Sequence, residues 1–166
     1  MDPLTISDYA LLNHPYKARM YQANAQNITG GADPFTISFD TIDYDPAGML
    51  TTGAGAKFTA PIAGLWFVCA HVTLSWTTTA GVYFADFTFT AGGARPAPVT
   101  RHDLGRRPQS AFTTTVGIYG VTQVMMSQND TMQFGIFQNN TTTAATRPTV
   151  GGSALTWFEV HFLRPI

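Results

Sequence analysis

The chain has 166 residues, which is enough for one domain with a sizeable hydrophobic core and short for two. Its net charge of -1 argues against a general nucleic-acid or anionic-membrane surface, and no run of 18 apolar residues is present to span a bilayer. Charged residues make up only 11% of the chain and aromatic residues 13%, so few groups can solvate a large free surface. We therefore expect part of the surface to be buried against other chains, rather than solvated by Thr, Ser, Asn and Gln alone.

The N-terminal segment, residues 1–19, differs from the rest of the chain. It carries acidic residues where a signal peptide has basic ones, and it lacks a long apolar region. We expect residues 1–19 to form an arm before a single domain at residues 20–166, in a protein made in the cytoplasm without a signal peptide. Tyr9, Leu11 and Leu12 of this arm are candidate contacts with a partner, ordered only on docking.

After residue 20, apolar and polar residues alternate in segments typical of β-strands. In residues 64–76, Trp66 and Val68 belong to one face while Phe67 and Cys69 belong to the other, because side chains alternate across a strand. The predicted strands are residues 20–26, 35–41, 57–59, 64–76, 82–90, 111–125, 131–138 and 153–163. Short, Thr-rich strands of this number predict an all-β fold with two sheets, a β-sandwich or jelly roll.

Pairs of turn-forming residues separate these strands. The pairs are Gly30 and Gly31, Asp45 and Pro46, Gly92 and Gly93, Asn129 and Asp130, Asn139 and Asn140, and Gly151 and Gly152. Cys69 is the only cysteine, which excludes an intrachain disulfide and a zinc site built on paired cysteines. Within an apolar strand it is expected to be a small buried hydrophobic residue.

Residues 91–109 have no strand pattern and are expected to form a long connector. This segment holds four of the nine cationic residues, Arg95, Arg101, Arg106 and Arg107, against one acidic residue, Asp103. Arginine suits carboxylate or phosphate partners, and loops on rigid β scaffolds often carry binding sites. The four arginines are therefore candidate partner contacts, with solvation of the loop or pairing with acids of a neighbouring subunit as the alternative.

The closing strand, residues 153–163, is apolar on both faces. Phe158, Val160 and Phe162 alternate with Leu155, Trp157 and Leu163. In a two-sheet sandwich only one face of a strand meets the other sheet, so a strand that is apolar on both faces needs a second cover. We predict a subunit interface formed by Leu155, Trp157, Phe158, Val160 and Phe162.

The segment from Phe39 to Ala70 resembles the C1q-domain signature in its spacing. The matching residues are Phe39, Asp45, Leu50, Phe58, Gly64 and Trp66; one extra residue separates Leu50 from Phe58, and Val68 and Ala70 replace the last two aromatics of the signature. The segments FTAP at 58–61, NDTMQF at 129–134 and WFEVHFL at 157–163 are similar to the same family. The resemblance covers residues 20–166 and is weakest at 91–110.

This resemblance implies a C1q/TNF-like jelly roll that packs as a compact homotrimer around an apolar axis. The chain has no collagen-like Gly-X-Y tract, so it is similar to the stalkless members of the family. Its segments AQNI, FDTIDYDPAGML and FTAPIAGLWFV look like those of head- and tail-surface proteins of tailed bacteriophages. The resemblance also implies that Asp45 caps a turn.

Residues for catalysis or metal binding are sparse. A cupin-type metal site needs a His-x-His pair and a glutamate, but His14, His71, His102 and His161 are isolated and Glu159 is the only glutamate. No hydrolase elbow, zinc-protease or phosphate-loop motif is present. We expect a protein that is not an enzyme and has no cofactor.

Asp40, Asp43 and Asp45 cluster in one predicted loop. Their carboxylates could offer oxygen ligands to Ca²⁺, or they could simply stabilise an acid-rich turn. Sequence alone leaves this open.

A virion structural protein is the function that these expectations favour. We expect a trimeric decoration protein on the capsid of a tailed bacteriophage, exposed on the virion surface and bound to the major capsid protein or another virion protein through the arm and the arginines. The alternative is the receptor-binding tip or a minor protein of a tail fibre, recognising a host-surface glycan or protein. A secreted C1q-like recognition protein is less favoured. Neither nucleic-acid binding nor membrane insertion is expected.

Overall fold

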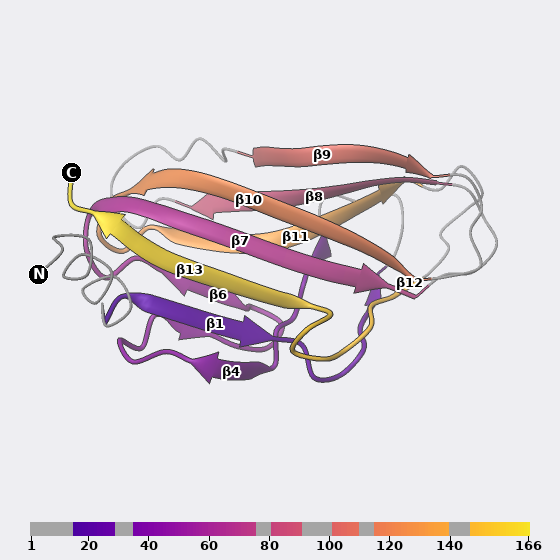
Figure 1. The fold of residues 1–166 in the computed structure, drawn as a ribbon, viewed down its shortest axis with the longest axis horizontal. Helices are drawn as coiled ribbons and strands as arrows, with labels where there is room; N and C mark the ends of the chain where they lie inside the picture. Colours follow the sequence, from indigo (N-terminus) through magenta and orange to yellow (C-terminus); the bar gives the residue numbers. More distant parts are fainter. Residues whose placement is uncertain (1–14, 29–34, 76–80, 91–100, 110–114, 140–146) are drawn as a thin grey trace, which may run out of the picture.

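Two antiparallel β-sheets packed face to face make up the fold (Figure 1). The computed structural model describes residues 15–28, 35–75, 81–90, 101–109, 115–139 and 147–166. Neighbouring strands across the five-stranded sheet are, in order, β10 (Val116–Met126), β7 (Gly64–Leu74), β13 (Trp157–Arg164), β1 (Lys17–Tyr21) and β4 (Thr41–Tyr44). Among the described residues the model contains strands, turns and bends and no helix, as the alternating sequence predicts.

The opposing six-stranded sheet contains β5 (Leu50–Thr51), β6 (Lys57–Thr59), β11 (Thr131–Asn139), β8 (Gly81–Thr90) and β9 (Arg101–Gln109), with β3 (Phe35–Thr36) also paired to β11. A small third sheet joins β2 (Asn27–Ile28) to β12 (Arg147–Pro148). Strands far apart in sequence are neighbours in both large sheets, since β13 lies between β1 and β7, and β11 lies between β6 and β8.

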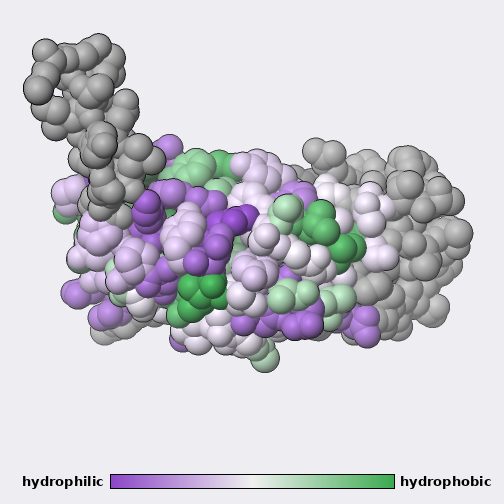
Figure 2. Space-filling model, turned by 60° about the horizontal axis from the view of Figure 1, so that its bottom comes forward, coloured by the Kyte–Doolittle hydropathy of each residue, from purple (hydrophilic) through white to green (hydrophobic). Residues whose placement is uncertain are grey.

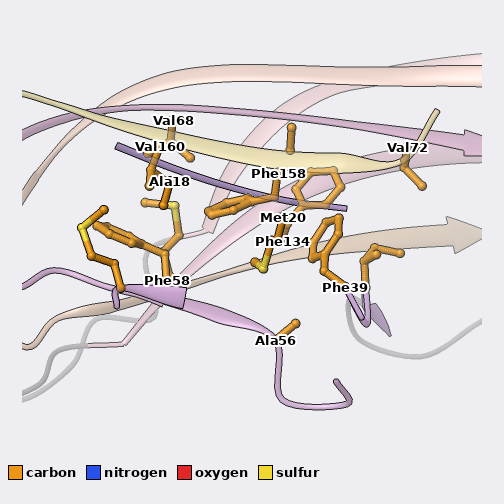
Figure 3. Packing of buried hydrophobic residues seen from close by; sticks show 14 of the residues in the cluster. Ala18, Met20, Phe39, Ala56, Phe58, Val68, Val72, Phe134, Phe158 and Val160 are labelled. Atoms are coloured by element: carbon orange, nitrogen blue, oxygen red, sulfur yellow. The ribbon is translucent and has the colours of Figure 1, made fainter. Parts of the chain in front are cut away.

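Large apolar side chains from both sheets fill the space between the layers (Figure 3). The Phe58 and Trp66 rings lie 4.8 Å apart between centroids, and Trp66 meets Phe162 edge-on at 5.1 Å. Phe39 lies between Phe134 of the six-stranded sheet and Phe158 of the five-stranded sheet. Burying rings of this size is worth roughly 4–6 kcal/mol each before entropy is counted, so these aromatics dominate the core.

Gly64 is needed because the chain passes close to its neighbours, and not because of an unusual backbone angle. A Cβ added there would lie 2.3 Å from the Phe162 ring and 2.6 Å from the Arg164 carbonyl oxygen. Gly64 opens β7, an interior strand of the five-stranded sheet, which explains why a glycine at this position of the C1q-like spacing is useful.

Turns lie where three of the predicted pairs place them. Asp45 accepts hydrogen bonds from the Met49 and Leu50 amides, which confirms the turn-capping role. Asn129 has a positive φ of 69° and opens the hairpin into β11, and Gly152 has a φ of 129° in the turn before β13.

Several predicted boundaries are wrong. The first strand begins at Lys17, so residues 17–19 belong to the sheet and not to an arm. The closing strand begins at Trp157 because the preceding residues form a turn in which the Leu155 and Thr156 amides donate to the Gly152 carbonyl. Residues 101–109, assigned to a connector, form β9 against β8, and the Asp43 region forms the edge strand β4.

Candidate interaction surface

The side of the five-stranded sheet that points away from the core is the candidate functional surface, called here the outer face. Strand register aligns its residues in rows that cross β10, β7, β13 and β1. One row consists of Tyr119, His71, Trp157 and Tyr21, the next of Val121, Cys69, Glu159 and Arg19, and a third of Gln123, Phe67, His161 and Lys17. Aromatic and apolar side chains therefore share this face with charged ones.

The first row is an aromatic cluster. Trp157 stacks on His71 with centroids 6.2 Å apart and meets Tyr119 edge-on at the same separation. The Arg19 guanidinium lies 5.4 Å from the centroid of the Trp157 ring, within the range of a cation–π contact. His71 Nδ1 lies 2.8 Å from the Leu155 carbonyl oxygen, which can only accept, so Nδ1 carries a hydrogen and donates.

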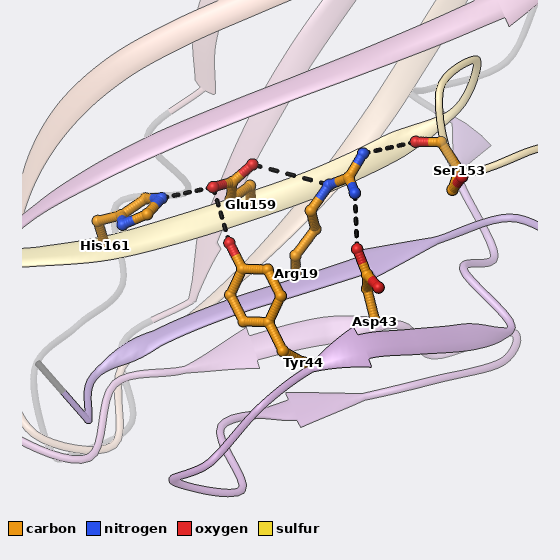
Figure 4. Close-up of polar contacts among 6 residues, drawn as sticks. All are labelled: Arg19, Asp43, Tyr44, Ser153, Glu159 and His161. Atoms are coloured by element: carbon orange, nitrogen blue, oxygen red, sulfur yellow. Dashed lines mark hydrogen bonds and ion pairs between the residues drawn. The ribbon is translucent and has the colours of Figure 1, made fainter. Parts of the chain in front are cut away.

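The second and third rows hold a polar network centred on Glu159 (Figure 4). The Tyr44 hydroxyl donates to Glu159 Oε1 at 2.8 Å, and His161 Nε2 lies 2.6 Å from the same oxygen. Arg19 Nε is 3.7 Å from Glu159 Oε2, which is longer than a hydrogen bond. Glu159 thus has a histidine as its nearest partner of potentially positive charge.

Arg19 makes its shorter contacts elsewhere. Its Nη1 lies 2.7 Å from an Asp43 carboxylate oxygen, and its Nη2 donates to the Ser153 carbonyl oxygen at 2.5 Å. One guanidinium therefore connects β1, β4 and the turn before β13, while its Cζ lies over the Trp157 ring. Among the residues whose side chains the structure describes, Arg19 is the arginine that Asp43 and Glu159 share.

These contacts and partial burial shift three pKa values. The hydrogen bond from His161 holds the pKa of Glu159 below its usual value despite burial, and Tyr44 adds to this effect. Burial and the neighbouring Glu159 carboxylate raise the pKa of Tyr44, so its hydroxyl stays protonated and donates. Burial first, and then Glu159, raise the pKa of Cys69 to about 12, which leaves an inert thiol as expected from the sequence.

Strand β10 gives the outer face a large uncharged margin. Its residues Tyr119, Val121 and Met125 are 54%, 42% and 65% exposed, and no charged residue occurs in Val116–Met126. Turning the β1 and β4 side toward the viewer shows separate hydrophobic patches among hydrophilic side chains (Figure 2). A long, uncharged strand at the edge of a sheet is a surface that proteins usually cover.

The predicted subunit-interface residues divide between the two sides of the sheet. Phe158, Val160 and Phe162 are 0%, 0% and 7% exposed within a single chain, so assigning them to an interface is wrong. They point at the other sheet because alternation places the even-numbered residues of β13 inside. Trp157 lies on the outer face, and Leu155 is 40% exposed in the turn before it. For these two the interface remains a prediction.

Only some of the other predicted contacts lie within the described residues. Arg101, Arg106 and Arg107 lie on the edge strand β9, so they do not belong to a loop. Tyr9, Leu11, Leu12 and Arg95 fall outside the described residues.

The three aspartates of the candidate calcium site each contact different partners. Asp40 accepts hydrogen bonds from the Ala23 and Asn24 amides, and these hold its pKa below its usual value although burial acts to raise it. Asp43 pairs with Arg19, and Asp45 caps its turn. In the described part of the chain no cluster of three potential metal-ligating side chains is found. The aspartates are not arranged as a shared site.

Sequence reasoning missed most of the outer face. Val121 and Met125 were not singled out, although the alternation in residues 116–126 carries the signal for an exposed apolar stripe. Arg19 was assigned to the arm, and its partners Asp43 and Glu159 are 24 and 140 residues away in sequence, a relation that no local pattern encodes.

Comparisons with known proteins identify the fold. The globular domain of the zebrafish complement 1qA protein superimposes with a TM-score of 0.62 at 11% identity, covering 90% of this chain and 98% of that one. Eiger TNF from S. frugiperda gives 0.60 at 12% identity, with 90% and 93% covered, and murine APRIL gives 0.57 at 13% identity, with 89% and 98% covered. The chain therefore has the C1q/TNF-like jelly-roll fold.

No protein-family model and no curated protein sequence matches the chain. Among the residues that the model describes, no helix has the length and hydrophobicity needed to cross a membrane.

Proposed function

We propose that this chain is a non-enzymatic structural protein that self-associates through the outer face into a homotrimer and serves on the surface of a virus particle. The observation that carries the self-association is the exposed apolar and aromatic stripe of the outer face, with Tyr119, Val121 and Met125 beside Trp157. A second copy of the same chain is the partner that this surface fits best.

The chemistry of the outer face supports self-association over binding of an unrelated charged partner. The face combines an uncharged margin on β10 with a network in which Arg19, Asp43 and Glu159 already neutralise one another in part. Such a surface resembles the interior of an interface, where aromatics are enriched and isolated charges are few. With the C1q/TNF-like fold, three copies closed around an axis would cover the face of every copy.

The virion role rests on different support. The support is the resemblance of the stretch that includes Asp40–Leu50 to tailed-phage surface proteins, noted from the sequence, together with a β-sandwich in whose described part no cluster of three potential metal ligands occurs. Capsid decoration is the favoured position, with the N-terminal segment and the arginines of β9 as contacts with the shell. A tail-fibre tip that binds a host-surface glycan is the alternative position.

Self-association is tested by placing a charge on the outer face. Trp157→Asp puts a carboxylate into the centre of the aromatic row, and loss of a central aromatic anchor typically costs 2 kcal/mol or more of association free energy. Light scattering after size exclusion should give a trimer mass for the parent protein and a monomer mass for the variant. Thr51→Asp, an exposed position of β5 in the other sheet, is the matched control and should remain trimeric.

An unchanged mass in Trp157→Asp, or a monomeric parent protein at all concentrations, would contradict assembly through this face.

The virion role is tested by locating the protein on purified particles by cryo-electron microscopy. Density on the head supports decoration, density at the tail tip supports the alternative, and absence from particles contradicts both. Removal of residues 1–14 leaves β1 intact, and it should abolish binding to the shell while the trimer persists.

A further inference from the structure

We infer that Met125 is an oxidation site coupled to assembly: a peroxide converts its thioether to the sulfoxide in a free subunit, and the oxidised subunit joins the trimer less readily. The inference rests on the self-association proposed above and names a residue through which it is regulated. Oxidation turns the flexible apolar side chain of methionine into a polar one, so its effect is largest where that side chain has to be covered.

Met125 differs from the other methionines in its exposure. It is 65% exposed, whereas the other methionines of the described residues are at most 2% exposed. These are Met20, Met49, Met126 and Met132, and Met1 falls outside the described residues. The cause is alternation along β10, which points Met125 away from the core and its chain neighbour Met126 into it. Within the described part of the chain, a peroxide in solution therefore reaches the Met125 thioether first.

The Cys69 thiol on the same face does not compete for the oxidant. Cys69 is only 6% exposed, and burial, with a smaller effect of Glu159, raises the pKa of its thiol to about 12. Peroxides react with the thiolate, which is nearly absent at neutral pH when the pKa is this high. A thioether has no proton to lose before it reacts, so oxidation of the outer face is directed to Met125.

The reaction is a two-electron transfer of one oxygen atom. A lone pair of the Met125 sulfur attacks one oxygen of hydrogen peroxide, the O–O bond breaks, and an S–O bond forms. The departing hydroxide takes the proton of the transferred oxygen and leaves as water. The sulfur is oxidised by two electrons, and the peroxide is reduced by the same two.

Met125 belongs to the uncharged margin of the outer face. Tyr119 and Val121 lie on the same side of β10, and Leu65 of β7 is opposite Met125 in the register. In a free subunit, water solvates a sulfoxide oxygen at this position. Covering the margin removes that water, which costs free energy for a polar oxygen and favours the apolar thioether. Oxidation therefore disfavours the assembled state more than the free subunit.

Assembly in turn protects Met125. A thioether covered by a second copy is out of reach of the oxidant, just as Met126 is inside a single subunit. Free subunits are therefore oxidised before assembled ones, and each oxidised subunit is withdrawn from the pool that can assemble.

The experiment treats the parent protein with hydrogen peroxide at neutral pH and measures both the modification and the assembly. Peptide mapping by tandem mass spectrometry should place the added oxygen on Met125 before Met126. Sedimentation velocity over a concentration series should show the half-assembly concentration rising on the order of tenfold after oxidation.

Two leucine variants separate Met125 from its neighbour. Met125→Leu keeps an apolar side chain of similar volume that cannot be oxidised, so it should assemble like the untreated parent and ignore the peroxide. Met126→Leu is the matched control and should keep the peroxide response of the parent. Met125→Gln carries a polar oxygen without any oxidant and should weaken assembly, while urea unfolding of the dilute subunit stays unchanged because position 125 is exposed.

The outcomes separate this inference from the self-association itself. Absence of trimer in the untreated parent at every concentration contradicts both. A trimer whose assembly is unaffected by complete oxidation of Met125, or a peroxide response that persists in Met125→Leu, contradicts only the role of Met125. The oxidation rate gives a measurement that needs no variant: Met125 should react more slowly at concentrations where the trimer predominates than in dilute samples, and equal rates would overturn the inference.

Discussion

The two faces of the five-stranded sheet are built from the same strands but differ in the side chains that they carry. Toward the core, β13 presents Phe158, Val160 and Phe162, which belong to the buried hydrophobic cluster, with Phe158 against Phe39 and Phe162 against Trp66. Outward, the alternate residues of the same strand are Trp157, Glu159 and His161, and these join an aromatic cluster to an ionic network. The alternation of side chains along β13 thus separates a face that packs in the core from a face that points away from it.

This difference shows what each face is for. The inner face is determined by the opposing sheet, which requires large side chains of suitable volume that are mostly apolar. Folding of one chain does not require an outer face with Tyr119, Val121 and Met125 exposed, and solvation would favour polar residues there. The composition of the outer face is explained if it is itself covered after folding, as proposed above.

The largest expected effect is on the inner face. Phe158→Ala removes a side chain with 0% exposure that contacts Phe39, and the cavity left behind should lower the free energy of unfolding by about 3–5 kcal/mol. Trp157→Ala, its neighbour on the outer face, should cost a subunit only about 0.5–1.5 kcal/mol for the lost ring contacts. Urea unfolding of dilute protein measures both.

Equal losses in the two variants would break the comparison, since they would mean that the outer face is as necessary for folding as the inner one. The association of Trp157→Ala supplies the control: it should weaken, although the subunit is only slightly destabilised.

The fold could be predicted in large part from the sequence because alternation is a local signal. Strands β7, β11 and β10 follow from periodicity, and the cap at Asp45 follows from the family resemblance. Strand β9 was missed because its sequence, RHDLGRRPQ, contains glycine, proline and four charged residues, so only pairing with β8 makes it a strand.

A smaller loss of unfolding free energy is expected at Gly64, where neighbouring atoms leave no room for a Cβ. Gly64→Ala would place a methyl group 2.6 Å from the Arg164 carbonyl oxygen, which is backbone and cannot turn away as a side-chain tip can. The strain should lower the free energy of unfolding by about 1–3 kcal/mol. Gly55→Ala is the control, because nothing lies within 4 Å of a Cβ there, and it should be neutral or slightly stabilising.

Thermal unfolding of the two glycine variants side by side is the measurement. A loss at Gly55 as large as that at Gly64 would show that chain flexibility, and not close packing, explains the glycine.

The candidate surface was less predictable than the fold, because its contacts join residues that are distant in sequence. Gln22 and Thr149, 127 residues apart, form a buried hydrogen bond that no pattern announces. The Arg19 network is of the same kind, since it joins β1, β4 and β13. Assigning both faces of the closing strand to an interface failed because a two-faced apolar strand does not reveal which face the other sheet takes.

A still smaller effect is expected from Arg19→Met on the outer face. The methionine keeps much of the apolar stem over Trp157 but leaves Asp43 and Glu159 without their shared guanidinium. Since both acids are partly solvated, the subunit should lose only about 1–2 kcal/mol of unfolding free energy. Arg19→Lys, which restores the charge without the fork, should recover part of the loss; if it recovers none, the fork geometry and not the charge is what matters.

The smallest expected effect is the response of the outer face to acid. Because hydrogen bonds from His161 and Tyr44 hold the pKa of Glu159 below its usual value, the stabilisation from its carboxylate is present above the titration range of an unfolded glutamate, near pH 4.3, and is lost as the pH falls through the lower pKa of the folded state. In dilute protein the loss should be within about 1 kcal/mol, since the group is partly exposed. Urea unfolding of the parent protein and of Glu159→Gln between about pH 3 and pH 7 checks it: the difference in unfolding free energy should shrink toward acid. A constant difference would mean that the ionised carboxylate of Glu159 contributes nothing to the stability of the subunit.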